Sequence, residues 1–108
     1  MTIPEIDLID GRAAFDAGLT TFLDIRQPND RAASAVPGSV ALGDHNVDDF
    51  VRATPKDKPL VVYCYHGISS RGATAYLLEL GFADVKSLRG GFVGWASAGL
   101  PATGGAER

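Results

Sequence analysis

The chain has 108 residues, a size that can build one hydrophobic core but not two. Hydrophobic residues make up 45% of it and the formal net charge is −3, with no basic run, which argues against nucleic acid or an anionic membrane as a partner. Its first residues lack the pattern of a signal peptide, and no apolar run is long enough to cross a bilayer. We expect one domain over residues 1–108, with its core at about 5–101 and a disordered tail at 102–108.

The first half of the chain alternates short strands with short helices. In order, the expected elements are a strand at 5–9, a helix at 11–17, a strand at 21–25, a helix at 28–34, a strand at 39–42 and a helix at 45–53. Asp10 can cap the first helix, and Gly18 can close it in a left-handed conformation. The strand at 21–25 is apolar except for Asp24, as expected of a strand that is buried on both faces.

The second half continues this alternation. The expected elements are a strand at 60–64, a helix that Ser69 or Ser70 caps and Gly81 ends, a strand at 84–88 and a last helix that contains Phe92 and Trp95 and ends at Gly99. Strands that alternate with helices predict an α/β fold. We therefore expect a central, mostly parallel sheet of about five strands, with helices on both faces.

Cys64 is the only cysteine, and it stands where the clearest strand of the chain ends. One thiol cannot form an internal disulfide, which suits a reducing cytoplasm. A lone cysteine at a strand end is either a small buried hydrophobic residue or a reactive group. In parallel sheets, ligands bind beyond the carboxyl ends of the strands, which is where this thiol falls.

The residues after Cys64 have the composition of an anion-binding loop. They are Tyr65, His66, Gly67, Ile68, Ser69 and Ser70. Gly67 supplies the backbone freedom of a tight loop, and the unpaired N–H groups at the start of the next helix suit an anion. These donors, helped by His66 and Arg71, favour a thiolate at neutral pH. The loop therefore predicts a nucleophile that faces a site for a second small anion.

Two anion chemistries use such a loop. Enzymes of the protein tyrosine phosphatase type need the spacing Cys-x5-Arg, so that the arginine holds the phosphate. Here Ser70 occupies the arginine position, and Arg71 lies about 100° further round the helix. Sulfur transfer through a cysteine persulfide requires the inward N–H groups but no such arginine. The spacing favours sulfur transfer and counts against a phosphatase or an arsenate reductase.

Three segments together resemble the rhodanese family, in particular its single-domain members of the bacterial GlpE type. Residues 64–82 look like the active-site segment with its Cys-Tyr-His-Gly-x-Ser-Ser loop, 22–30 like the strand that ends in Asp-[Val/Ile]-Arg, and 88–101 like the closing Leu-x-Gly-Gly-x-x-x-Trp helix. The resemblance implies a rhodanese-like fold and thiosulfate sulfurtransferase activity. It implies that Cys64 takes the sulfane sulfur from thiosulfate or another small anionic donor, and that cyanide or a thiol accepts it.

Two positions depart from the family pattern. Ser34 and Ala35 stand where many members have Gly-His before a Pro-Gly pair, which predicts different hydrogen bonding around that turn. Ile68 stands where loops of the GlpE type can carry a polar residue. An apolar side chain at that place could favour an organic or protein-bound persulfide over hydrated thiosulfate.

The remaining polar residues have supporting interpretations. Asp24 and Arg26 could serve catalysis, but a buried ion pair that ties the strand end to the loop is the leading interpretation. His66 either modulates the thiolate or has no role, and Arg71 either attracts anions or is a solvated charge. No second His, Cys or carboxylate stands at ligand spacing, so we expect neither a metal nor another cofactor.

An alternative to the enzyme is a persulfide carrier or interaction module with little thiosulfate activity. In that case Tyr65 and Ile68 would form an apolar surface around the loop that docks a thiol-bearing protein. The two hypotheses differ in the sulfur donor that they predict, thiosulfate for the enzyme and a partner's persulfide for the carrier.

Overall fold

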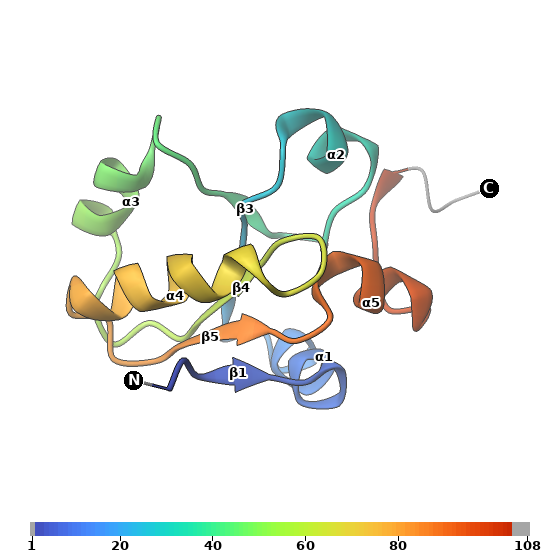
Figure 1. Ribbon diagram of the computed structural model, residues 1–108, viewed down its shortest axis with the longest axis horizontal. Coiled ribbons are helices and arrows are strands. Elements are labelled where there is room, and N and C mark those ends of the chain that lie inside the picture. The colour runs from blue at the N-terminus through green and yellow to red at the C-terminus, as the bar shows by residue number, and fades with distance from the viewer. Residues whose placement is uncertain (1, 105–108) are drawn as a thin grey trace.

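The computed structural model describes residues 2–104, which form a five-stranded sheet with helices on both faces (Figure 1). The strands are β1 (Glu5–Ile6), β2 (Thr21–Asp24), β3 (Val40–Ala41), β4 (Leu60–Tyr63) and β5 (Val85–Leu88). The helices are α1 (Leu8–Ala17), α2 (Pro28–Ala33), α3 (Val47–Ala53), α4 (Ser69–Glu79) and α5 (Gly91–Ser97). The predicted α/β fold is confirmed, and every pairing in this sheet is parallel.

Strand β4 lies at the centre of the sheet, whose strand order is β1-β5-β4-β2-β3. All four residues of β4 are buried, which explains its uninterrupted apolar sequence. Its neighbour β2 pairs with it so that Asp24 lies opposite Tyr63. Because parallel strands end at the same edge of a sheet, the segments that follow β2 and β4 meet there.

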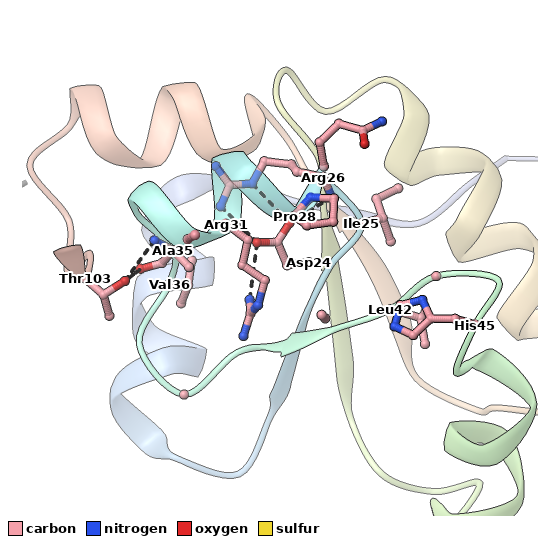
Figure 2. Close-up of a pocket in the computed structure, with 15 residues that line it drawn as sticks. Asp24, Ile25, Arg26, Pro28, Arg31, Ala35, Val36, Leu42, His45 and Thr103 are labelled. Atoms are coloured by element: carbon pink, nitrogen blue, oxygen red, sulfur yellow. Dashed lines mark hydrogen bonds and ion pairs between the residues drawn. The ribbon is translucent and has the colours of Figure 1, made fainter. Parts of the chain in front are cut away.

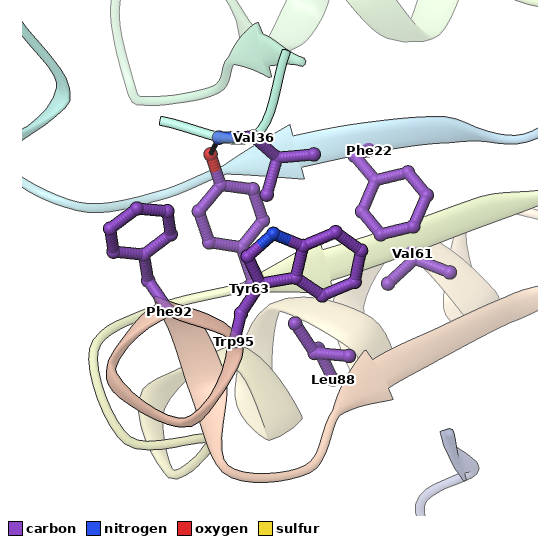
Figure 3. Packing of buried hydrophobic residues seen from close by; sticks show 7 residues of the cluster. All are labelled: Phe22, Val36, Val61, Tyr63, Leu88, Phe92 and Trp95. Atoms are coloured by element: carbon purple, nitrogen blue, oxygen red, sulfur yellow. Dashed lines mark hydrogen bonds between the residues drawn. The ribbon is translucent and has the colours of Figure 1, made fainter. Parts of the chain in front are cut away.

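Two hydrophobic layers hold the helices on the sheet. On one face Phe22 and Tyr63 pack with Trp95 of α5, and the rings of Phe22 and Trp95 meet edge to face at 5.7 Å (Figure 3). On the other face, Leu23 and Val62 pack against α3 and α4. Neighbouring strand residues thus serve opposite layers, as the period of two of a strand requires. Within residues 2–104, no helix combines the length and the apolar character needed to cross a membrane.

Helix α1 begins earlier than the sequence predicted. The expected strand at 5–9 ends at Ile6, and the helix starts at Leu8. Asp7, not Asp10, caps it, because the N–H of Asp10 donates to Oδ1 of Asp7 at 2.8 Å. Two aspartates three residues apart both fit a cap by residue type, and the prediction chose the wrong one. Gly18 closes the helix with φ of 77°, as expected.

Helix α4 has no side-chain cap, so the prediction that Ser69 or Ser70 caps it was wrong. Both serines are inside the helix, and Ile68 precedes them at the N-cap position. Ser70 is completely buried. Its hydroxyl has a different partner, the sulfur of Cys64.

Residues 102–104, expected in a disordered tail, are part of the described structure. The N–H of Thr103 donates to the carbonyl of Ala35 at 2.8 Å, and the N–H of Ala35 donates to Oγ1 of Thr103 at 3.0 Å. The Ser34 hydroxyl donates to the carbonyl of Thr103 at 2.6 Å. The two residues that depart from the family pattern therefore bind the C-terminal segment. Residues 105–108, the rest of the expected tail, lie outside the described residues.

Candidate active site

The thiol of Cys64 lies in a compact loop between β4 and α4. The backbone N–H groups of Gly67 and Ser70 donate to its Sγ at 3.2 and 3.3 Å. The Ser70 hydroxyl lies 3.3 Å from the same sulfur. Cys64 is 4% exposed, so these donors take the place of water around a largely buried sulfur. The loop therefore brings three of the predicted site residues together at one atom.

These hydrogen bonds change the acidity of the thiol. Burial alone raises the pKa of Cys64, since it disfavours the charged form. The Ser70 hydroxyl and the N–H groups of Ser70, Gly67 and His66 outweigh burial, and the net effect lowers the pKa below its ordinary value. In residues 2–104, no charged side chain forms a hydrogen bond with this sulfur. The hydrogen-bond donors to this sulfur are thus neutral, and they favour its ionised form.

The turn between β5 and α5 holds the loop in place. The N–H of Phe92 donates to the carbonyl of Cys64 at 2.8 Å, and the N–H of Val93 donates to that of Tyr65 at 2.9 Å. Gly91 makes this approach possible: it has φ of 61°, and a Cβ on it would lie 2.4 Å from the Tyr65 carbonyl oxygen. The glycine at position 91 thus lets the backbones of the two segments approach closely.

Ser87 of β5 is a site residue that the sequence analysis missed. Its Oγ lies 2.7 Å from Oγ of Ser70, and both residues are completely buried. The one available signal was a small polar residue between the half-buried Lys86 and the apolar Leu88 of this strand. Only the packing of α4 on β5 shows that this hydroxyl contacts Ser70, which in turn contacts the sulfur.

Asp24 and Arg26 form a buried ion pair at the end of β2. Nε and Nη2 of Arg26 donate to the two oxygens of Asp24 at 3.0 and 2.9 Å, and both side chains are at most 4% exposed. Arg31 and the Tyr63 hydroxyl donate to Oδ2 of the same carboxylate at 3.3 and 3.0 Å. Burial tends to raise the pKa of Asp24, but its bonds to Arg26 outweigh burial and lower the pKa.

This ion pair connects several elements beside the cysteine loop. The Arg26 guanidinium lies 4.2 Å from the ring centre of Phe92 and donates to the carbonyl of Ser34 at 2.7 Å. A cavity of about 590 Å³ lies against the pair and is lined also by Arg31 and His45 (Figure 2). No residue of the cysteine loop lines this cavity. The guanidinium also lies 6.0 Å from the ring centre of Tyr65, so the ion pair ties the end of β2 to the cysteine loop.

The other predicted loop residues face outward to different degrees. Tyr65 is half-buried, and its hydroxyl donates to a carboxylate oxygen of Asp30. Ile68 is 65% exposed, and His66, Ser69 and Arg71 are exposed as well. Arg71 forms no ion pair or side-chain hydrogen bond within the described part of the chain. Residues 2–104 also contain no cluster of three His, Cys, Asp or Glu side chains that could hold a metal ion.

Comparisons with known proteins agree with this geometry. The family model for the rhodanese-like domain matches residues 7–98. Thiosulfate sulfurtransferase GlpE of Pseudoalteromonas translucida is 40% identical over 98 residues, which cover 91% of this chain and 93% of that protein. The protein of the same name from Pseudomonas fluorescens is 52% identical over 75 residues, 69% of each chain. A rhodanese-like domain of Anabaena superposes with a TM-score of 0.85 at 25% identity, over 100% of this chain and 84% of that one.

Proposed function

The chain belongs to the rhodanese family, and we propose on this basis that it is a thiosulfate sulfurtransferase that works through a persulfide on Cys64. One observation carries the proposal: two backbone N–H groups and the Ser70 hydroxyl surround a single buried sulfur. Such a set of donors stabilises negative charge on sulfur without a metal or an arginine. The two similar proteins named thiosulfate sulfurtransferase support the same reaction.

In the first half of the reaction, the Cys64 thiolate attacks the outer sulfur of thiosulfate. A bond forms between Sγ and that sulfur, the S–S bond of thiosulfate breaks, and sulfite leaves with the electron pair. The negative charge of the enzyme moves from Sγ to the outer sulfur of the persulfide. The loop donors contribute by keeping the attacking sulfur ionised at neutral pH.

In the second half, cyanide or a thiolate acceptor attacks the outer sulfur of the persulfide. The S–S bond of the persulfide breaks and the electron pair returns to Sγ, which the same donors stabilise. A thiol with a lowered pKa is the better leaving group in such exchanges, so one set of hydrogen bonds assists both halves. Because the reaction needs a reduced thiol, we place it in a reducing compartment, the cytoplasm.

Phosphoryl transfer is disfavoured by the position of a single residue. Ser70, not an arginine, occupies the sixth position after Cys64, and its buried hydroxyl contacts the sulfur. Arg71 is exposed on the next helical position. A bidentate arginine clamp for phosphate is therefore missing from the place where this chemistry requires it.

One observation favours the carrier function as a second candidate. Ile68 exposes 65% of its surface at the start of α4, beside the loop. An apolar group there would suit an organic or protein-bound persulfide. Tyr65, the other residue expected at such a surface, instead directs its hydroxyl to Asp30.

Steady-state assays separate these functions. The protein should form thiocyanate from thiosulfate and cyanide, and Cys64→Ser should form none. A carrier would give negligible thiocyanate from thiosulfate but would transfer sulfur rapidly from glutathione persulfide. Hydrolysis of p-nitrophenyl phosphate by the wild type, lost in Cys64→Ser, would contradict both. Ile68→Asn should slow transfer from glutathione persulfide more than from thiosulfate if Ile68 selects the donor.

A further inference from the structure

Two buried hydroxyls form a chain that leads to the sulfur of Cys64. Sγ lies 3.3 Å from Oγ of Ser70, which lies 2.7 Å from Oγ of Ser87. Ser70 lies in the first turn of α4 and Ser87 lies in β5, so two separate elements supply the chain. Both residues are completely buried. Within residues 2–104, the Ser87 hydroxyl has Ser70 as its one hydrogen-bond partner.

The protonation state of Cys64 determines the direction of this chain. A thiol can donate its proton to Oγ of Ser70, which leaves the Ser70 hydroxyl free to donate to Ser87. A thiolate can only accept, so the single proton of the Ser70 hydroxyl must then point at the sulfur. The contact of 2.7 Å between the two serines persists only if Ser87 becomes the donor. Ionisation of Cys64 therefore requires both hydroxyls to turn in the same sense.

We propose that Ser87 is a positioning residue, which donates to Ser70 and thereby turns the Ser70 hydroxyl onto the sulfur when Cys64 is ionised. The proposal rests on the proposed function only in taking Cys64 as the nucleophile. A hydroxyl that accepts a hydrogen bond becomes a stronger donor, so Ser87 also strengthens the bond from Ser70 to the sulfur. Ser87 acts through Ser70 and does not itself touch the substrate.

Among the described residues, the charged side chains near the cysteine loop form no hydrogen bond with the sulfur of Cys64. Lys86 and Arg89, the neighbours of this part of β5, pair with Asp84 and Glu5. At the end of β2, Asp24 is bound by Arg26 and Arg31. The exposed side chains of His66 and Arg71 make no hydrogen bond to Sγ within the described structure. The direct hydrogen-bond partners of the sulfur are therefore all neutral. The direction in which the Ser70 hydroxyl donates thus affects how readily Cys64 ionises.

The effect of Ser87 can be measured without sulfur transfer. The rate at which iodoacetamide alkylates Cys64 follows the thiolate fraction, so its dependence on pH gives the midpoint of ionisation. In Ser87→Ala we expect this midpoint to move to higher pH and the alkylation rate at neutral pH to fall about threefold. Should the protein prove inactive with thiosulfate, the alkylation experiment still tests Ser87.

Thr74→Val is the matched control. Thr74 is also completely buried in α4, but its hydroxyl donates to the backbone carbonyl of Ser70 at 2.8 Å and not to the hydroxyl chain. We expect Thr74→Val to lower the melting temperature without moving the alkylation midpoint. Ser87→Thr, which keeps the hydroxyl, should restore the wild-type midpoint. An equal shift in Thr74→Val and Ser87→Ala would overturn the proposal, because it would reduce Ser87 to a packing residue.

A double-mutant cycle tests whether Ser87 acts through Ser70. Ser70→Ala removes the hydroxyl that contacts the sulfur, so a following Ser87→Ala should change the midpoint no further. Equal shifts from Ser87→Ala in the presence and absence of the Ser70 hydroxyl would overturn the proposed route. An unchanged midpoint in the single variant Ser87→Ala would overturn the proposal itself.

Discussion

The hydrogen-bond donors around Cys64 determine how readily its thiol ionises. Its sulfur is mostly removed from water, and removal from water makes ionisation harder. Two N–H groups and one hydroxyl reverse that effect without any nearby cation bonded to the sulfur. Ser70 stands where phosphatase-type enzymes need an arginine, so this residue favours sulfur transfer over phosphoryl transfer.

The pH dependence of the reaction follows from this acidity. The lowered pKa of Cys64 means that the thiolate forms below the usual range of a free cysteine, about 8.5. We expect kcat/KM for thiosulfate to rise with pH as the thiol ionises, and to level off before that range is reached. A pH profile of the wild type checks this. A midpoint at or above the value of free cysteine would contradict the effect assigned to the hydrogen bonds.

Asp24→Asn should destabilise the fold strongly. The variant removes the one carboxylate that two guanidinium groups share in a buried position, and loss of one partner from a buried pair costs about 3–5 kcal/mol. Urea unfolding measures the loss. Asp16→Asn is the control, because Asp16 forms an exposed pair with Arg12 and should change stability by less than about 1 kcal/mol. Similar losses of stability in both variants would show that burial does not strengthen the effect of the Asp24 ion pair.

The buried pair also makes stability depend on pH. The pKa of Asp24 is lower in the folded protein than its usual value of about 3.9 in an unfolded chain. The ionised Asp24 therefore makes its full contribution to the free energy of unfolding above that usual value. This contribution is lost as the pH falls through the lower pKa of the folded state. Acid unfolding of the wild type and of Asp24→Asn should show this loss in the wild type alone.

At the scale of elements, the loop after β4 depends on the turn before α5. Two hydrogen bonds join their backbones, and the glycine at position 91 lets them approach. The sequence predicted the loop from Gly67 and its polar neighbours, and it predicted the turn as the segment between the strand at 84–88 and the last helix. It could not show that they touch, since this contact joins residues that lie far apart in the chain.

Gly91→Ala tests this contact directly. A Cβ at that position would overlap the Tyr65 carbonyl oxygen, at 2.4 Å, on a backbone with φ of 61°. We expect a loss of stability of more than about 2 kcal/mol and a loss of thiosulfate activity. Gly72→Ala is the control: its Cβ would meet open space in an exposed part of α4, and the variant should gain about 0.5–1 kcal/mol. Unfolding curves should therefore shift in opposite directions for the two variants, and only Gly91→Ala should lose activity. Full activity in Gly91→Ala would contradict the dependence of the loop on this contact.

At the scale of the whole molecule, local patterns predicted the order of strands and helices because buried parallel strands require nearly continuous apolar runs. Local patterns also located Cys64, Gly67 and Ser70. They failed where two residues suited one role, as with Asp7 and Asp10. They also failed where a role depends on packing, as with the contact of Ser87 to Ser70.

The C-terminal segment shows the same limit, since residues 102–104 were expected in a disordered tail and are part of the described structure. Four hydrogen bonds join Thr103 to Ser34 and Ala35, and the indole of Trp95 donates to the carbonyl of Pro101 at 2.7 Å. Deletion of residues 102–108 should therefore lower stability by about 1–3 kcal/mol in urea unfolding, whereas deletion of 105–108 removes none of these bonds and should not. Equal stability of the two truncated proteins would contradict a structural role for Thr103.

A persulfide on Cys64 can be detected by intact-mass spectrometry of the protein before and after thiosulfate, with Cys64→Ser alongside. We predict a mass gain of one sulfur atom in the wild type, its removal by cyanide and no gain in the variant. An unchanged wild-type mass, or the same gain in Cys64→Ser, would contradict a persulfide on Cys64.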